Sequence, residues 1–138
     1  MRTLSVYGVE SVSDWYKFRG WDATGQKGWV YGDLVHNKRI LKDEPFLENR
    51  VMVGGYEVVP ESVGICTGKT DCHEHLLYEG DICSFVCYGR LIYAKIAYID
   101  ILAGFRFVDK DNFCISMDFA NGIFHVGNMY ENKKFLDR

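Results

Sequence analysis

The chain has 138 residues and a net charge of −3, and 48% of its residues are hydrophobic, 15% aromatic and 25% charged. This length and composition fit one folded domain, or two small ones, and exclude a disordered chain. The charge includes no basic tail, which argues against nonspecific nucleic-acid binding, and no run approaches the roughly 18 apolar residues of a membrane-spanning helix.

In chain order, the first half carries scattered strand signals. Residues 28–35 (GWVYGDLV) are rich in aromatic and β-branched side chains and predict a strand. The apolar and basic residues of 33–43 predict a helix there. A short strand over 56–59 is stopped by Pro60, which has no N–H to donate to a strand ladder.

The clearest signal lies between residues 81 and 99. The run 81–88 alternates, and one of its faces comprises Cys83, Phe85 and Cys87. The run 91–99 alternates in the same way, and one of its faces comprises Ile92, Ala94, Ile96 and Tyr98. A short glycine-containing segment separates the two runs, so we predict an antiparallel hairpin.

Further short elements follow this hairpin. They comprise strands over 104–108, 113–116 and 123–126, turns over 109–112 and 121–122, and a terminal helical turn over 132–138. Short strands at this spacing favour a small barrel or sandwich over a parallel α/β sheet, which would need longer intervening helices. The predicted fold class is therefore mainly β, with short antiparallel strands.

The cysteines favour an intracellular protein without metal. They are five in number, which is odd, and no secretory signal precedes them, so reduced thiols in a cytoplasm are expected. Cys83 and Cys87 would lie about 13 Å apart along one strand, too far to share a zinc ion or a disulfide. We expect them to be small buried hydrophobes. His73 and His75 are expected in a polar loop, because further ligands at zinc spacing are lacking.

One segment invites a phosphate-binding interpretation. Residues 64–70 (GICTGKT) resemble a phosphate loop, but Val63 stands where that loop requires glycine. No helix of the required length is predicted after it. A structural turn at Thr67 and Gly68 is the preferred interpretation.

An acidic cluster follows, formed by Asp71, Glu74, Glu79 and Asp81. Its carboxylates suit a divalent cation or acid–base work, but the spacing of an EF-hand is absent. We interpret the cluster as a solvated loop with turn-forming carboxylates. In this interpretation Gly80 supplies a conformation that a Cβ would oppose, and Asp81 accepts hydrogen bonds from amides of the turn.

Aromatic and basic residues alternate in the first third of the chain. Such residues on a small β-protein grip a peptide or stack single-stranded nucleic acid, although aromatic side chains also build small cores. The candidate interaction surface comprises Trp15, Tyr16, Lys17, Arg19, Trp21, Trp29 and Tyr31.

Three stretches together carry a family resemblance. They are 17–22 (KFRGWD), 59–82 (VPESVGICTGKTD, CHEHL and LYEGDI) and 126–132 (VGNMYEN). In this order they resemble the YopX family of bacteriophage proteins, with Gly20 where that family usually has alanine. The family-motif positions, which we expect to be structural, are Phe18, Asp22, Pro60, Gly64, Thr67, Gly68, Asp71, Tyr78, Glu79, Gly80, Asp81, Gly127, Asn128 and Tyr130.

The resemblance implies a mainly β fold of two parts. An SH3-like barrel over residues 59–138 would pack with a smaller β-rich part over residues 1–58, unless both form one compact unit. It further implies a phage or prophage protein in a bacterial cytoplasm. It implies no activity, no catalytic residue, no metal ligand and no cofactor.

Three functional hypotheses follow. The first is a non-enzymatic module that binds a protein partner or its own copies through the aromatic surface, without a membrane. The second is a single-stranded nucleic-acid binder that uses the same aromatic and basic residues. The third, which the cysteine and histidine contexts disfavour, is a small metal-dependent or cysteine-dependent hydrolase.

Overall fold

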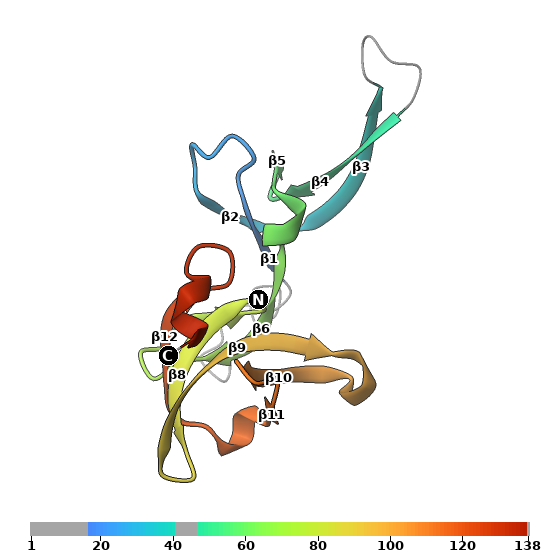
Figure 1. The fold of residues 1–138 in the computed structure, drawn as a ribbon. Helices are drawn as coiled ribbons and strands as arrows, with labels where there is room; N and C mark the ends of the chain where they lie inside the picture. Colours follow the sequence, from blue (N-terminus) through green and yellow to red (C-terminus); the bar gives the residue numbers. More distant parts are fainter. Residues whose placement is uncertain (1–16, 41–46, 138) are drawn as a thin grey trace, which may run out of the picture. The chain divides into compact units, whose positions relative to one another are not determined.

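The computed structural model of the chain describes residues 17–40 and 47–137. In these residues twelve strands form three antiparallel sheets, and the helices are short 3-10 turns (Figure 1). The prediction of a mainly β chain is therefore confirmed. No helix among the described residues is long and apolar enough to cross a membrane.

The chain divides into two compact units, Met1–Cys66 (unit 1) and Thr67–Arg138 (unit 2). The division falls inside strand β6 (Gly64–Thr70), which begins in unit 1 and ends in unit 2. The boundary expected between residues 58 and 59 lies earlier in the chain.

Unit 1 is built from short strands around a small core. The strands are β1 (Phe18–Trp21), β2 (Trp29–Gly32), β3 (Leu34–Ile40), β4 (Leu47–Val53) and β5 (Tyr56–Glu57), followed by the 3-10 helix η3 (Pro60–Ser62). Strand β1 pairs with β2 and with the start of β6, and β3, β4 and β5 form a three-stranded sheet. Val30, Val53 and Val58 are the buried centre of the core.

The helix predicted over 33–43 is wrong as far as residue 40, and residues 41–43 lie outside the described residues. Residues Leu34–Ile40 are strand β3, which pairs with the whole of β4 in a long two-stranded ribbon (Figure 1). Leu34 lies opposite Val53 in this register and packs against the core of unit 1. Cross-strand pairing and burial therefore override a weak local helical pattern.

Unit 2 contains a five-stranded antiparallel sheet. After β7 (Leu76–Tyr78) come β8 (Asp81–Cys87), β9 (Arg90–Ile99), η4 (Asp100–Leu102), β10 (Gly104–Asp109), β11 (Cys114–Ile115), η5 (Met117–Phe119), β12 (Asn121–Asn128) and η6 (Lys133–Asp137). The strand order is β11-β10-β9-β8-β12, with β11 and β12 at the edges. Among the described strands this sheet is open, and no closed barrel is formed.

The predicted hairpin over residues 81–99 is confirmed as β8 and β9. Cys87 pairs with Arg90, which leaves a two-residue turn. Both turn residues have positive φ, 51° at Tyr88 and 76° at Gly89, which is the pattern of a type I′ turn. The twist of such a turn matches the twist of the two strands, which explains the tight connection.

The inward face of this hairpin forms the core of unit 2. Cys83, Phe85 and Cys87 are buried, as predicted, and Phe85 stacks on Phe107 of β10 at 4.3 Å between ring centroids. The full buried cluster comprises Leu77, Cys83, Phe85, Cys87, Ala94, Ile96, Phe107 and Met117. Tyr98, predicted on the same face, is instead 45% exposed, because it lies near the end of β9.

Two predicted turns are wrong and are irregular strand instead. Asn121 and Gly122 begin strand β12, whose register with β8 shifts between Asn121 and Phe124. Thr67 and Gly68 lie inside β6. Gly68 has a φ of +80° and Gly122 a φ of +62°, so each glycine gives local irregularity without ending the strand.

Candidate functional site

The aromatic and basic residues of the first third converge on one face of the β1–β2 hairpin. Arg19 pairs with Tyr31 and Trp21 with Trp29, so the register places these four side chains on the same side of the hairpin. Trp15 and Tyr16 lie outside the described residues.

A cation–aromatic stack occupies this face. The Arg19 guanidinium lies 4.4 Å from the centroid of the Trp29 ring, and Trp21 contacts that residue edge-to-face at 5.3 Å. Arg19 is only 5% exposed, whereas Tyr31 is 50% exposed. Lys17 is half-buried, and its carbonyl accepts a hydrogen bond from the Cys66 N–H. Tyr31 is therefore the most exposed aromatic residue of this face.

The first family motif ends in a loop anchor, Asp22. Its carboxylate accepts hydrogen bonds from the Thr24 hydroxyl at 2.8 Å and from the N–H groups of Thr24 and Lys27, each at 3.1 Å. The hydroxyl of Thr24 is the main cause that lowers the pKa of Asp22. Phe18 packs against the core of unit 1. These positions therefore shape the hairpin.

In unit 2, Asp71 is a buried carboxylate that ties a loop to a strand. Its Oδ1 accepts the N–H groups of His73 and His75, each at 2.9 Å, and its Oδ2 accepts the N–H of His125 on β12 at 3.2 Å. The His75 ring lies 3.3 Å away. Burial acts to raise the pKa of Asp71, but these donors outweigh it and lower the pKa to about 2.

Asp81 is a second buried carboxylate, and it also contacts His125. The Tyr78 N–H donates to its Oδ2 at 2.7 Å, and the His125 Nε2 lies 3.1 Å from its Oδ1. The prediction that Asp81 accepts from an amide of its turn is confirmed. Neither Asp71 nor Asp81 is solvated, which corrects that part of the prediction, because each replaces water with several protein donors.

The glycine turn before β8 and the closing motif meet through their backbones. Gly80, with a φ of +93°, donates its N–H to Ile96 and accepts the N–H of Met129 at 2.7 Å. Asn128 exchanges hydrogen bonds with Glu131, at 2.8 and 3.0 Å. A Cβ at Gly127 would lie 2.7 Å from the Asn132 side chain, so the loop packs closely against this glycine.

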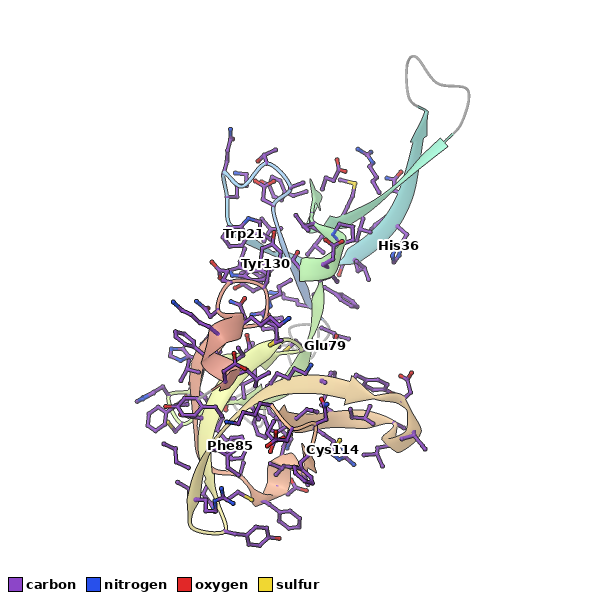
Figure 2. All side chains as sticks on the ribbon, in the orientation of Figure 1. Trp21, His36, Glu79, Phe85, Cys114 and Tyr130 are labelled. Carbon is purple, nitrogen blue, oxygen red and sulfur yellow. The ribbon has the colours of Figure 1, made fainter. Side chains whose placement is uncertain are left out.

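Most of the remaining motif positions also lie in defined elements of the fold. Pro60 begins η3, Gly64 begins β6 and the Thr67 hydroxyl donates to the Leu77 carbonyl at 2.8 Å. Tyr78 is buried, Glu79 is half-buried and Tyr130 is 42% exposed (Figure 2 labels Glu79 and Tyr130).

The five cysteines are free, and they fall into two groups. Cys66, Cys83 and Cys87 are buried, whereas Cys72 and Cys114 are exposed. Burial, with the nearby charges of Asp81 and Asp71, raises the pKa of Cys83, which disfavours a thiolate nucleophile there. Within residues 17–40 and 47–137, no three His, Cys, Asp or Glu side chains are grouped to hold a metal ion.

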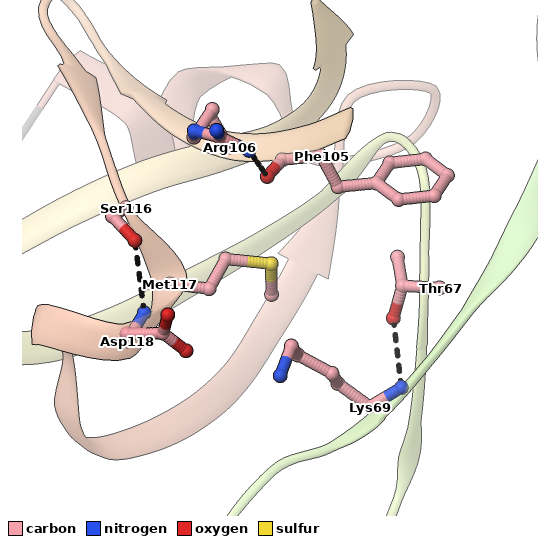
Figure 3. A pocket seen from close by; sticks show the side chains of 7 residues that line it. All are labelled: Thr67, Lys69, Phe105, Arg106, Ser116, Met117 and Asp118. Atoms are coloured by element: carbon pink, nitrogen blue, oxygen red, sulfur yellow. Dashed lines mark hydrogen bonds between the residues drawn. The ribbon is translucent and has the colours of Figure 1, made fainter. Parts of the chain in front are cut away.

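A cavity of about 230 Å³ lies in unit 2 between β6, β10 and η5 (Figure 3). Its lining combines cations, hydroxyls, a carboxylate and apolar groups, namely Thr67, Lys69, Phe105, Arg106, Ser116, Met117 and Asp118. No motif in the sequence predicts this cavity. The one sequence feature that marks the cavity is Lys69, in the segment that resembles a phosphate loop. This lysine lies on strand β6, and its side chain reaches into the cavity.

Unit 2 also exposes an apolar cluster at the end of the β8–β9 hairpin, which we call the hairpin tip. Tyr88 is 86% exposed and Leu91 64% exposed, and Leu91 pairs across the strands with the exposed Val86. Phe119 of η5 is 56% exposed and lies 6.3 Å from the Tyr88 ring. The sequence patterns described above do not predict the tip, although a tyrosine before Gly89 in a two-residue turn is a usable signal.

The fold and these sites define a small β-sheet protein whose motif residues shape turns and loops. The chain matches the family model described as YopX protein over residues 17–137, and it belongs to this family, which confirms the resemblance. None of the curated proteins compared with it matches.

Proposed function

We propose that this phage or prophage accessory protein is a non-enzymatic protein-interaction module. Unit 2, as an SH3-like scaffold, presents the hairpin tip to a second copy of the chain in the bacterial cytoplasm. The tip consists of Val86, Tyr88, Leu91 and Phe119.

The backbone conformation and the exposure of Tyr88 are the main support for this proposal. Its φ of 51° is strained for a bulky side chain, and the turn would be satisfied better by asparagine, aspartate or glycine. The same side chain is 86% exposed, so it adds little to the core. A solvent-exposed residue that strains the backbone lowers the stability of the free protein, and this cost points to a role in binding.

The charges beside the tip favour a second copy as the partner. Arg90 lies two residues after Tyr88 in sequence, Asp118 directly precedes Phe119, and both charged residues are exposed. A two-fold contact would pack apolar side chains together and pair the Arg90 of each copy with the Asp118 of the other. The net charge of −3 gives little repulsion between copies.

Sedimentation velocity over a concentration series tests the proposal. We expect the wild-type chain to dimerise and Tyr88→Asn to be monomeric. The same substitution should raise the free energy of unfolding by about 1 kcal/mol, because it relieves the strained turn. Phe113→Asn is the matched control, since Phe113 is 67% exposed in another turn of unit 2.

A wild-type chain that stays monomeric at its highest attainable concentration would overturn self-association, and binding to an unrelated protein would not rescue it. If Phe113→Asn weakened self-association as much as Tyr88→Asn does, the association would come from nonspecific contacts of exposed apolar side chains. That result would overturn the role of the tip.

The shared face of the β1–β2 hairpin favours one alternative, a single-stranded nucleic-acid binder. Its exposed Tyr31 lies in line with the Arg19, Trp21 and Trp29 stack. Titration of tryptophan fluorescence with mixed oligonucleotides at low salt would show quenching that Tyr31→Ser removes and Tyr56→Ser preserves. An unchanged fluorescence would eliminate this alternative.

A further inference from the structure

The cavity of unit 2 brings two cations together from separate strands. Lys69 comes from β6 and Arg106 from β10, and both line the cavity (Figure 3). In the described part of the chain neither forms an ion pair with a carboxylate. The one acidic group in the lining is Asp118. The cavity therefore carries an excess of positive charge that no ion pair with the described residues neutralises.

Arg106 is held in place before any ligand arrives. Its Nη1 donates to the carbonyl of Phe105 at 2.8 Å, and a Cβ at Gly104 would lie 3.1 Å from the same nitrogen. This single bond occupies a small part of the donor capacity of a guanidinium, so most of its N–H groups remain for an anion. A fixed guanidinium loses less side-chain entropy on binding than a freely moving one.

The remaining lining is apolar or hydroxylic. Met117 is 7% exposed and, with Phe105, offers a thioether and an aromatic ring. The Ser116 hydroxyl accepts the Asp118 N–H at 3.3 Å, and its own hydrogen is left for a ligand oxygen. The volume of about 230 Å³ is smaller than the roughly 300–1,000 Å³ of sites for drug-sized ligands. It suits a single ring or one large side chain.

We propose that this cavity binds a small organic anion, a carboxylate or phosphate joined to an aromatic body. The anion lies between Lys69 and Arg106, and the ring packs on Phe105 and Met117. Either a free small molecule or an acidic aromatic side chain of a peptide supplies this chemistry. Val86, Tyr88, Leu91 and Phe119 of the hairpin tip do not line the cavity, but Asp118, which the two-fold contact would pair with Arg90, does. Substitution of Lys69, which takes no part in that contact, therefore tests the cavity apart from self-association.

Isothermal titration with phenyl phosphate, phenylacetate and uncharged benzyl alcohol tests the anion requirement. We expect saturable binding of both anions and none of the alcohol. Lys69→Gln should weaken binding by roughly tenfold, as expected for loss of a charge-assisted hydrogen bond. Asp118→Asn should strengthen it by roughly threefold, because it removes a like charge. Lys110→Gln, at an exposed turn outside the cavity, is the matched control.

Lys69→Gln is the decisive variant, because Lys69 is exposed and its side chain supports no described contact of the fold; circular dichroism checks that it folds. Comparison of a phosphotyrosine peptide with phenyl phosphate distinguishes the two possible sources of the ligand. Tighter binding of the peptide would identify the ligand as a protein segment, and equal binding would identify it as a free small molecule. Absence of saturable binding, equal binding of benzyl alcohol, or equal weakening by Lys110→Gln would each overturn the proposal.

Discussion

The two units differ in what supports their sheets. Unit 1 has a centre of three buried valines, and a cation–aromatic stack covers one face of its β1–β2 hairpin. Unit 2 has a larger core with stacked phenylalanines, and its loops are fixed by two buried carboxylates. A small core is thus supplemented by a cation–aromatic stack, whereas the larger unit depends on buried carboxylates, and hydrogen-bond donors hold the pKa of one of them, Asp71, at about 2.

The largest effect should come from the core of unit 2. Phe85→Ala is expected to lower the free energy of unfolding by about 3–5 kcal/mol, because Phe85 is 1% exposed and stacks on Phe107. Val53→Ala in unit 1 should cost about 2 kcal/mol, since it removes less buried volume. Urea unfolding followed by circular dichroism measures both. An equal or larger cost at Val53 would contradict the difference between the two cores.

The next effect concerns Asp71. Asp71→Asn should lower the free energy of unfolding by about 2 kcal/mol at neutral pH, because the folded pKa is about 2 against an ordinary value of 3.8. Above the ordinary value both states are ionised and the stabilisation is complete. Below it the unfolded chain takes up the proton first, so the stabilisation is lost as the pH falls from about 4 to about 2.

Urea unfolding of wild type and variant from neutral to acidic pH measures this difference. The two stabilities should converge as the pH falls. Asp111→Asn, in an exposed turn of the same unit, should show neither the cost nor the convergence. A constant difference down to the lowest pH would mean that Asp71 stabilises unit 2 without its charge.

A smaller effect is expected at a close contact in unit 1. A Cβ at Gly20 would lie 2.8 Å from the Cβ of Val58, which is 2% exposed. Gly20→Ala should therefore cost about 1–2 kcal/mol by overpacking. In a Val58→Ala background the same change should cost much less. Additive costs in this double-mutant cycle would show that the two side chains do not compete for space.

The smallest effect should come from the stack. Arg19→Met keeps much of the side-chain volume and should cost about 1 kcal/mol, because it removes the cation above Trp29. Tryptophan fluorescence follows this change well, since all three tryptophans precede residue 30. Lys27→Met, which removes a cation 5.0 Å from the exposed Tyr56 ring, should change stability less. A larger cost at Lys27 would reverse this ranking.

Local patterns predicted the elements that local chemistry controls. The alternation over residues 81–99 correctly predicts the hairpin and its inward face. The residue types of the turn correctly predict that Asp81 accepts a hydrogen bond from a turn amide. The helix over 33–43 failed because pairing with β4 decides that segment. The predicted turns at Gly68 and Gly122 failed because a positive φ at glycine serves a strand irregularity as well as a turn.

The candidate sites depend on long-range contacts, which a single sequence hardly reveals. Lys69, Arg106 and Asp118 meet only after three separate segments have folded. The same holds for His125, which contacts Asp71 and Asp81 although each lies more than forty residues away in sequence. Residue types suggested structural turns at these aspartates, but their burial comes from the tertiary fold.

The unequal exposure of the thiols gives the chain built-in chemical reporters. Cys72 and Cys114 are open to a thiol-reactive reagent in the native protein, while Cys66 in unit 1 and Cys83 and Cys87 in unit 2 are shielded. Each shielded sulfur reacts only when its surroundings open, so peptide-resolved labelling rates yield a separate opening free energy for each unit. These rates therefore show whether the two units open together or independently, in water and without denaturant or an engineered label.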